Sequence, residues 1–318
     1  MKLQWLISGS NCYSPSLACT QYSRRCFVYT PLGKAYERSN KGEAGRTMSS
    51  RTVRRAIPES DPIWHVTQGD TPLVAAAIHN GHAVRPEVAE RLALDEAARR
   101  REEDPFTGEW TAVAPTRIVA LRSRFEVDLN RPRHQAVYRE PADAWGLHVW
   151  NETPSEALIA RSLAEYDAFY AELQRIYTEA GRRFGRFVVF DLHSYNHRRE
   201  GPKGPAADPE ANPEVNIGTG TMDRGRWASV VDRFIADLRA FDFMGHHLDV
   251  RENVRFKGGQ HPRWTHQTFP DSGCALAIEF KKLFMDEWTG KPDRAQLEAI
   301  RQALQSTVPG VLEALQKL

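Results

Sequence analysis

Residues 186–193 read Arg-Phe-Val-Val-Phe-Asp-Leu-His, an apolar run that ends abruptly in polar residues. A run that is apolar at consecutive positions is typical of a β-strand buried on both faces. Four further stretches predict strands of the same kind: residues 71–78, 116–121, 215–220 and 274–280.

Between these strands, apolar residues recur at intervals of three and four, which predicts amphipathic helices. The predicted helices are residues 86–101, 155–180, 227–238 and 293–306. We expect Pro309 and Gly310 to break or kink the end of the last one. Strands that alternate with helices predict an α/β domain whose mostly parallel sheet is covered on both faces. In such sheets, ligands bind beyond the carboxyl ends of the strands.

The composition is that of a globular protein. The chain has 318 residues, of which 41% are hydrophobic, and its 43 Lys and Arg nearly balance its 41 Asp and Glu. This excludes a collagen, a nucleic-acid coat and a wholly disordered chain. No apolar run approaches the ~20 residues that span a bilayer. We therefore expect neither nucleic acid nor a membrane as a partner.

The first part of the chain differs from the rest. Residues 1–57 are rich in Ser, Arg, Gly and Tyr without regular periodicity, so we expect a disordered extension followed by a single α/β domain over 58–318. Met48 is a plausible alternative start. Cys12, Cys19 and Cys26 lie in this extension at a spacing that matches no usual zinc knuckle. Cys274 alone belongs to the body, which favours a reducing compartment, the cytoplasm.

Two polar clusters follow predicted strands. His79-Asn80-Gly81-His82 comes directly after 71–78, where the two imidazoles could share a metal ion and Gly81 would let the backbone approach a ligand. They could equally be two surface histidines in a loop. In the second cluster, an extended chain over 122–131 would place Arg124, Glu126, Asp128 and Asn130 on one face, either at a solvated edge or on the floor of a site.

Within that second cluster, Asn130 and Arg131 could together hold a substrate carboxylate, because the planar guanidinium group offers paired donors.

Two more clusters lie within predicted strands. His193 stands at the carboxyl end of its strand, where Asp191 could orient the imidazole ring, although a loop cap is the alternative. Glu279 interrupts the apolar run 274–280. A carboxylate there needs either a basic partner, such as Lys281 or Lys282, or a functional reason.

In this order along the chain, the four clusters resemble the N-formylglutamate amidohydrolase family, which is similar to zinc carboxypeptidases and aspartoacylase. The resemblance covers about residues 78–287. It rests on His79-Asn80-Gly81, Val127–Arg131, Asp191–Ser194 and the strand that contains Glu279. It implies a three-layer α/β/α fold of the zinc-carboxypeptidase type (phosphorylase/hydrolase-like), with a mixed, mostly parallel sheet.

The resemblance also implies one Zn²⁺ ion ligated by His79 and His193. The third ligand stays open. Carboxypeptidases place a Glu three residues after the first His, where this chain has His82. Either His82 or Glu126 would complete the set, and the spacing slightly favours His82. Both sets leave a coordination position for water.

For the remaining residues, the resemblance implies that Glu279 is the general base and that Asn130 and Arg131 hold a carboxylate of the substrate. The expected reaction is hydrolysis of a small anionic N-acyl amino acid, N-formyl-L-glutamate, to formate and L-glutamate. Zn²⁺ lowers the pKa of its water to roughly 7, which makes hydroxide available near neutral pH. The alternatives are a carboxypeptidase-like peptidase and an inactive binding protein, in which a salt bridge would hold Glu279. The sequence leaves the oligomeric state open.

Overall fold

Four parallel strands form the centre of a nine-stranded mixed sheet. In spatial order they are β11 (Gly273–Lys281), β6 (Phe187–Tyr195), β4 (Leu73–Ala77) and β5 (Thr116–Ala120). All residues of β4 and β6 are buried, which explains why their sequences are almost continuously apolar. The computed structural model describes residues 25–29, 35–37 and 62–318.

Antiparallel pairing appears on both sides of this centre. On one side, β7 (Val215–Gly218) is antiparallel to β11, and β10 (Val250–Glu252) continues parallel to β7. On the other side, β3 (Trp64–Gln68) pairs antiparallel with β5. A separate hairpin joins β8 (Asp242–Phe243) to β9 (His246–His247). The structure thus confirms a mixed sheet whose centre is parallel.

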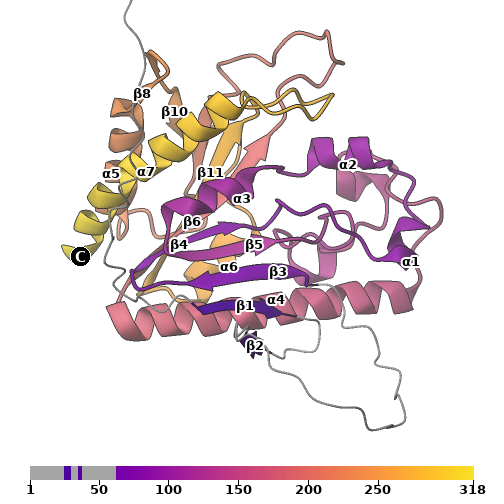
Figure 1. Ribbon diagram of the computed structural model, residues 1–318, viewed down its shortest axis with the longest axis horizontal. Helices are drawn as coiled ribbons and strands as arrows, with labels where there is room; N and C mark the ends of the chain where they lie inside the picture. Colours follow the sequence, from indigo (N-terminus) through magenta and orange to yellow (C-terminus); the bar gives the residue numbers. More distant parts are fainter. Residues whose placement is uncertain (1–24, 30–34, 38–61) are drawn as a thin grey trace, which may run out of the picture.

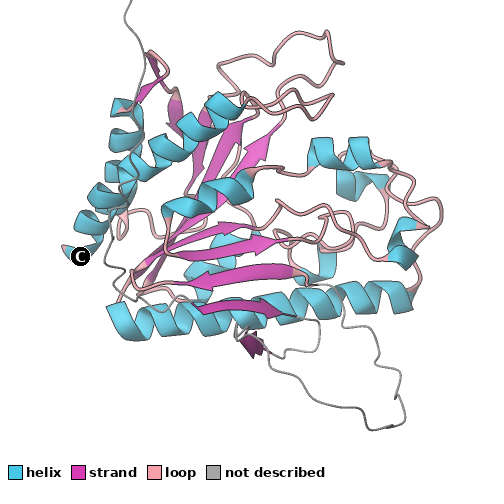
Figure 2. Cartoon of the chain, viewed as in Figure 1, coloured by secondary structure: helices cyan, strands magenta, loops and turns pink. Residues whose placement is uncertain are grey.

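Helices cover both faces of the sheet (Figure 1). One face packs against α4 (Glu156–Phe184) and α6 (Gln260–Thr268), and the other against α3 (Thr107–Trp110), α5 (Ala228–Ala240) and α7 (Arg294–Gln316). The short helices α1 and α2 lie beside the sheet (Figure 2). The remaining bounds are Pro86–Ala89 for α1, Glu96–Glu102 for α2, and Thr111–Val113, Arg133–Gln135 and Pro141–Ala144 for the 3₁₀ helices.

Strand β6 supplies both hydrophobic cores because its successive side chains point to opposite faces. Phe187 and Val189 belong to the core under α4, whereas Val188, Phe190 and Leu192 belong to the core under α5 and α7. This packing confirms the predicted three-layer arrangement.

Two helix predictions need correction. The predicted helix 86–101 is two short helices, and Asp95 caps the second by accepting a hydrogen bond from Ala98 N at 2.7 Å. We expected a break or a kink at Pro309, and the break is absent, since α7 runs through this residue. A Cβ atom on Gly310 would lie 2.6 Å from Arg233 Cζ, so α7 packs closely against α5 at this point, and tertiary packing outweighs the local effect of proline.

Two strands fall inside the stretch 1–57 that we expected to be a disordered extension. They are β1 (Arg25–Tyr29), which pairs antiparallel with β3, and β2 (Ala35–Glu37), which pairs with β1. The division of the chain into an extension over 1–57 and a single domain over 58–318 stays a prediction. Cys26 lies in β1, whereas Cys12, Cys19 and Met48 lie outside the described residues.

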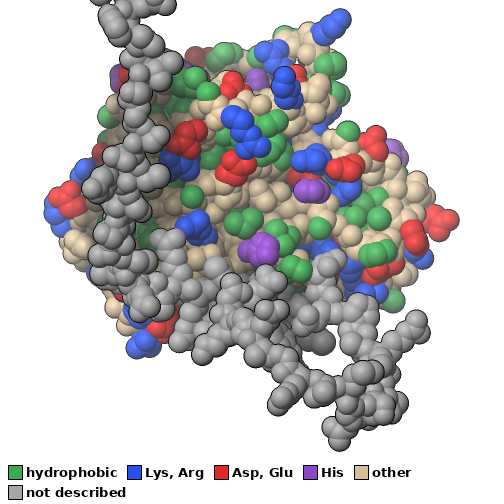
Figure 3. All heavy atoms as spheres, viewed as in Figure 1, with side chains coloured by type: hydrophobic (Ala, Val, Ile, Leu, Met, Phe, Trp, Pro, Cys, Tyr) green, Lys and Arg blue, Asp and Glu red, His purple; other side chains and the backbone are tan. Residues whose placement is uncertain are grey.

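Among the described helices, none combines the length and the apolar character that crossing a bilayer requires. On the face drawn in Figure 3, basic and acidic side chains of the described residues are interspersed. This distribution agrees with the near balance of charges in the sequence.

Gly81 fixes how the loop after β4 lies on the loop after β5. A Cβ atom there would overlap the carbonyl carbon of Leu121 and lie 2.6 Å from Arg122 N. Beside this contact, Ala83 N donates to Leu121 O at 3.0 Å. We expected Gly81 to let the backbone approach a ligand. The structure shows that the backbone of Leu121 and Arg122 occupies this space instead.

We predict that Gly81→Ala lowers the free energy of unfolding by about 2 kcal/mol or more, because backbone rather than a flexible side chain occupies the space. Denaturant unfolding measures the loss. Gly225→Ala is the matched control: a Cβ there meets only Asp223 Oδ1, at 3.4 Å, so its change should stay within about 0.5 kcal/mol. Equal stability of both variants would contradict the packing described for Gly81.

Candidate active site

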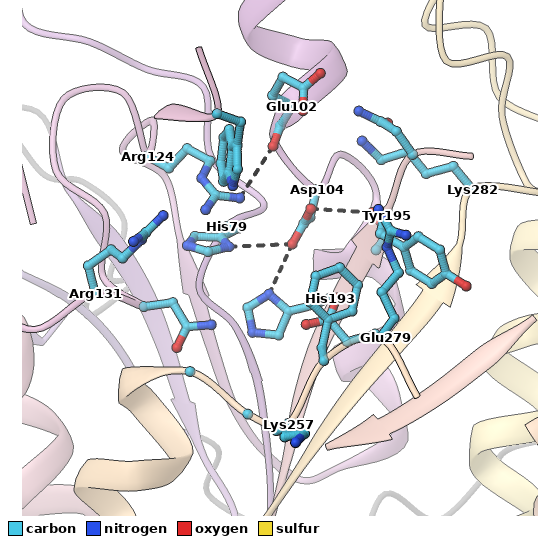
Figure 4. A pocket seen from close by; sticks show the side chains of 18 of the residues that line it. His79, Glu102, Asp104, Arg124, Arg131, His193, Tyr195, Lys257, Glu279 and Lys282 are labelled. Atoms are coloured by element: carbon cyan, nitrogen blue, oxygen red, sulfur yellow. Dashed lines mark hydrogen bonds and ion pairs between the residues drawn. The ribbon is translucent and has the colours of Figure 1, made fainter. Parts of the chain in front are cut away.

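Three buried side chains converge at the carboxyl ends of β4 and β6. His79 follows β4 by two residues, and His193 lies near the end of the neighbouring β6. Their ring centroids are 5.0 Å apart. Asp104 Oδ2 lies 3.5 Å from His79 Nδ1 and 3.0 Å from His193 Nδ1 (Figure 4). Among the described residues, these three form the group whose ligand atoms could surround one metal ion.

Asp104 was not predicted, and the tertiary structure explains its position. Its backbone N–H donates to His79 O at 2.9 Å, so the two residues are held together through the main chain as well. The buried Lys282 donates from Nζ to Arg101 O at 2.6 Å and to Glu103 O at 2.7 Å, which fixes the segment before Asp104. The run Glu102-Glu103-Asp104 before Pro105 is the signal in the sequence that could have suggested a carboxylate ligand.

Neither predicted third ligand reaches this centre, so both predictions are wrong. The side chain of His82 is exposed. Glu126 is buried elsewhere, where it accepts hydrogen bonds from Arg85 N at 2.7 Å and Arg85 Nε at 2.6 Å. The prediction for Glu126 assumed an extended chain over 122–131, but the chain turns there, with Glu126 N donating to Ser123 O at 3.0 Å. The turn removes the two-residue alternation that would place these side chains on one face.

On the side away from Asp104, one further carboxylate lies near Nε2 of each imidazole. Asp128 Oδ1 is hydrogen-bonded to His79 Nε2 at 2.7 Å. Asp191 Oδ1 lies 3.1 Å from His193 Nε2, which is an ion-pair distance. The same oxygen is hydrogen-bonded to His261 Nδ1 at 2.8 Å. If a metal ion were bound beside Asp104, these contacts would keep the proton of each ring on Nε2 and leave Nδ1 free to act as a ligand. Asp191 thus lies where a residue that orients His193 should lie.

The electrostatics of this centre favour a cation. Burial alone would lower the pKa of His193, but Asp191 and Asp104 raise it well above its usual value. Burial opposes ionisation of Asp104 too, yet its hydrogen bonds with His193 and His79 keep its pKa well below the usual value. Two imidazole nitrogens and a carboxylate oxygen are ligands that Zn²⁺ accepts. The residues present therefore fit a divalent metal ion.

Glu279 lies beside this centre on β11, directly opposite His193 in the pairing with β6. Burial raises the pKa of its carboxyl group to about 7, and Asp104 and Asp191 add to the rise. Lys282 donates to backbone carbonyls instead, and no ion pair between Glu279 and any cation occurs within the described part of the chain. The basic partner considered for Glu279 is thus absent there, which leaves its carboxylate available to a reactant.

Asn130 and Arg131 face the same cavity. Asn130 Oδ1 accepts a hydrogen bond from His261 N at 3.0 Å, which leaves the amide hydrogens on Nδ2 to serve as donors. Arg131 Nη2 donates to Asp143 O at 3.3 Å, and no carboxylate among the described residues pairs with this guanidinium. In Figure 4 Arg131 lies on one side of the His79–Asp104–His193 group, and Tyr195 and Glu279 lie on the other.

The cavity has a volume of about 620 Å³, enough for a small ligand. The structure brings five of the seven predicted site residues to its walls, as it does Asp104. The five are His79, Asn130, Arg131, His193 and Glu279. The cavity is also lined by cations to which no prediction assigned a role, among them Arg199 and Lys257.

Solved structures share this fold. The N-formylglutamate amidohydrolase of Ralstonia eutropha JMP134 is 18% identical, and the match has a TM-score of 0.63 and covers 80% of this chain and 98% of that one. A gene product of Agrobacterium tumefaciens is 19% identical, with a TM-score of 0.55 over 77% of this chain and 92% of that one.

A search of curated proteins found no match to this chain. The family model described as N-formylglutamate amidohydrolase, however, matches residues 71–285. This range contains the three residues of the possible metal site, the unpaired Glu279 and the Asn130–Arg131 pair. The match extends over most of the α/β domain, and the chain therefore belongs to the N-formylglutamate amidohydrolase family.

Proposed function

We propose that this protein hydrolyses the amide bond of an N-acylated acidic amino acid, N-formyl-L-glutamate, to formate and L-glutamate. The observation that carries the proposal is the single cavity in which an unpaired carboxylate, Glu279, adjoins the His79–Asp104–His193 group and faces an unpaired guanidinium, Arg131. The family assignment supports amide hydrolysis. Because Glu279 is not held in a salt bridge, an inactive binding protein is the poorer explanation.

In this proposal, His79, Asp104 and His193 hold one Zn²⁺ ion. When bound, zinc polarises a carbonyl group and lowers the pKa of a coordinated water. Asp128 and Asp191 keep the two rings oriented from behind, and such supporting carboxylates raise the basicity of the ligating imidazole.

The other residues bind the substrate and move protons. Arg131 and Asn130 hold the α-carboxylate, which places the scissile amide beside Glu279. The Glu279 carboxylate accepts a proton from the attacking water and passes it to the leaving nitrogen as the carbon–nitrogen bond breaks. Its raised pKa, about 7, suits a group that must both accept and return a proton near neutral pH.

The buried, free Cys274 supports a location in the reducing cytoplasm.

The first prediction concerns the metal ligands. Asp104→Asn should lower zinc affinity at least about 10-fold, because the neutral amide is a weaker ligand than the carboxylate. Competition with a chromophoric chelator measures the affinity without an assay of turnover. His82→Ala is the matched control and should retain the wild-type affinity, since its side chain is exposed. A loss of zinc in the His82 variant alone would restore the prediction made from the sequence.

The second prediction concerns the reaction. Zinc-loaded protein should release formate from N-formyl-L-glutamate, and Glu279→Gln should lower kcat by about 10²–10⁴-fold at unchanged zinc content. Formate production, coupled to its oxidation, follows turnover, and elemental analysis gives the metal content. If wild-type protein instead cleaved only the C-terminal residue of peptides, the peptidase alternative would hold. Full activity of the Gln variant would rule out Glu279 as the base.

The third prediction concerns substrate binding. Arg131→Ala should raise KM about 10- to 100-fold with a smaller change in kcat, because a charge-assisted contact to a carboxylate is lost at a distance from the reacting carbon. Steady-state kinetics on N-formyl-L-glutamate separate the two constants. A variant with wild-type KM would show that the carboxylate binds elsewhere.

A further inference from the structure

The proposed function leaves one carboxylate of the substrate without a partner. An N-acyl acidic amino acid carries two, and Arg131 with Asn130 accounts for the first. Several other cations line the cavity, but most are engaged. Arg124 pairs with Asp128 at 2.8 Å, Arg199 lies 3.7 Å from Glu102, and Lys282 bonds to backbone carbonyls. Of the described cations in the cavity, Arg255 and Lys257 remain besides Arg131, and neither pairs with a described carboxylate.

The backbone of Arg255 is fixed to the strand beside Glu279. Arg255 N donates to Asn216 Oδ1 at 2.8 Å, and the same amide donates from Nδ2 to Phe256 O at 2.8 Å. Asn216 lies on β7, directly opposite Glu279 in the pairing with β11. The loop that carries Arg255 is therefore held in register with the proposed general base.

The side chain of Arg255 is held as well. Its Nη1 donates to Asn212 Oδ1 at 2.6 Å, and the guanidinium carbon lies 5.4 Å from the ring centroids of both Tyr195 and Phe256. These contacts order the guanidinium before any ligand arrives, which lowers the entropic cost of binding. The side chains of Arg255 and Lys257 are both exposed, but no comparable hydrogen bond or ring contact holds Lys257 among the described residues. Arg255 is thus the better-ordered cation of the two.

The loop that carries Arg255 ends beside Asn130, which we propose binds the α-carboxylate together with Arg131. A Cβ atom on Gly259 would lie 2.5 Å from Asn130 Cγ, and Gln260 N donates to Asn130 O at 3.0 Å. Residues 255–259 therefore connect the Glu279 side of the cavity to the Asn130 side, and in Figure 4 Lys257 lies below the His193–Glu279 pair. This connection ties the loop that carries Arg255 to Asn130, the neighbour of Arg131.

We propose that Arg255 binds the side-chain carboxylate of the N-acyl amino acid and thereby makes the enzyme specific for acidic substrates. The inference rests on the proposed function. It assigns the α-carboxylate to Arg131 and Asn130 and the side-chain carboxylate to Arg255. A planar guanidinium that is already ordered suits a carboxylate better than a flexible ammonium group does.

The experiment compares N-formyl-L-glutamate with N-formyl-L-glutamine, which has nearly the same shape but a neutral side chain. Arg255→Met should lower the ratio of kcat/KM for glutamate over glutamine by about 10- to 100-fold, the size expected for one hydrogen-bonded charge pair. Arg255→Lys, which keeps the charge but loses the planar donors, should lower the ratio less. Arg186→Met removes a positive charge at the opposite end of β6 and should leave the ratio at its wild-type value.

An unchanged ratio in folded Arg255→Met, with thermal unfolding as the check, would overturn the assignment. If wild-type protein hydrolysed neither compound, the proposed function would fail. The role of Arg255 would then be decided by calorimetric binding of L-glutamate and L-glutamine. Weaker binding of glutamate alone in the Met variant would support the assignment, and equal effects on both amino acids would refute it.

Discussion

The buried carboxylate of Asp104 contacts Nδ1 of both His79 and His193, and the rest of the site is arranged around this contact. Three segments distant in the chain supply the three residues. Asp128, Asp191 and Glu279 bring further carboxyl groups close by, and ionised carboxylates in a buried place are costly without compensating positive charge. A divalent ion at the centre would supply that charge. The carboxyl groups around the two imidazoles would thus favour a cation at the centre.

The parallel centre of the sheet supplies the rigidity that this arrangement needs. His79, His193 and Glu279 lie at or just beyond the carboxyl ends of β4, β6 and β11, where register fixes their spacing. His261 then connects the proposed metal site to the proposed substrate site, because its ring bonds to Asp191 while its backbone N–H bonds to Asn130. Asn130 is therefore linked to His193 through three contacts, by way of His261 and Asp191.

Local sequence patterns predict some elements of this fold correctly and others not. The strands that contain His193 and Glu279 form within one or two residues of the predicted bounds, because full burial leaves a continuous apolar run in the sequence. The segment 122–131 does not follow its apparent alternation, since salt bridges from Arg85 and Arg122 draw Glu126 away from the cavity. Pro309 lies inside a continuous helix, although a proline predicts a break. This helix, α7, packs on α5, and the local sequence does not reveal that packing.

The sequence alone determined the layered α/β fold, the resemblance to the family, and five of the residues that line the cavity, because strand ends are visible as abrupt changes from apolar to polar residues. It did not determine the third ligand, since His82 and Glu126 satisfied spacing rules that take no account of the path of the chain. Only the folded structure brought Asp104 to the two imidazoles and turned Arg255 toward the same cavity. Both depend on long-range backbone hydrogen bonds, and such contacts leave no periodic signature in the amino-acid order.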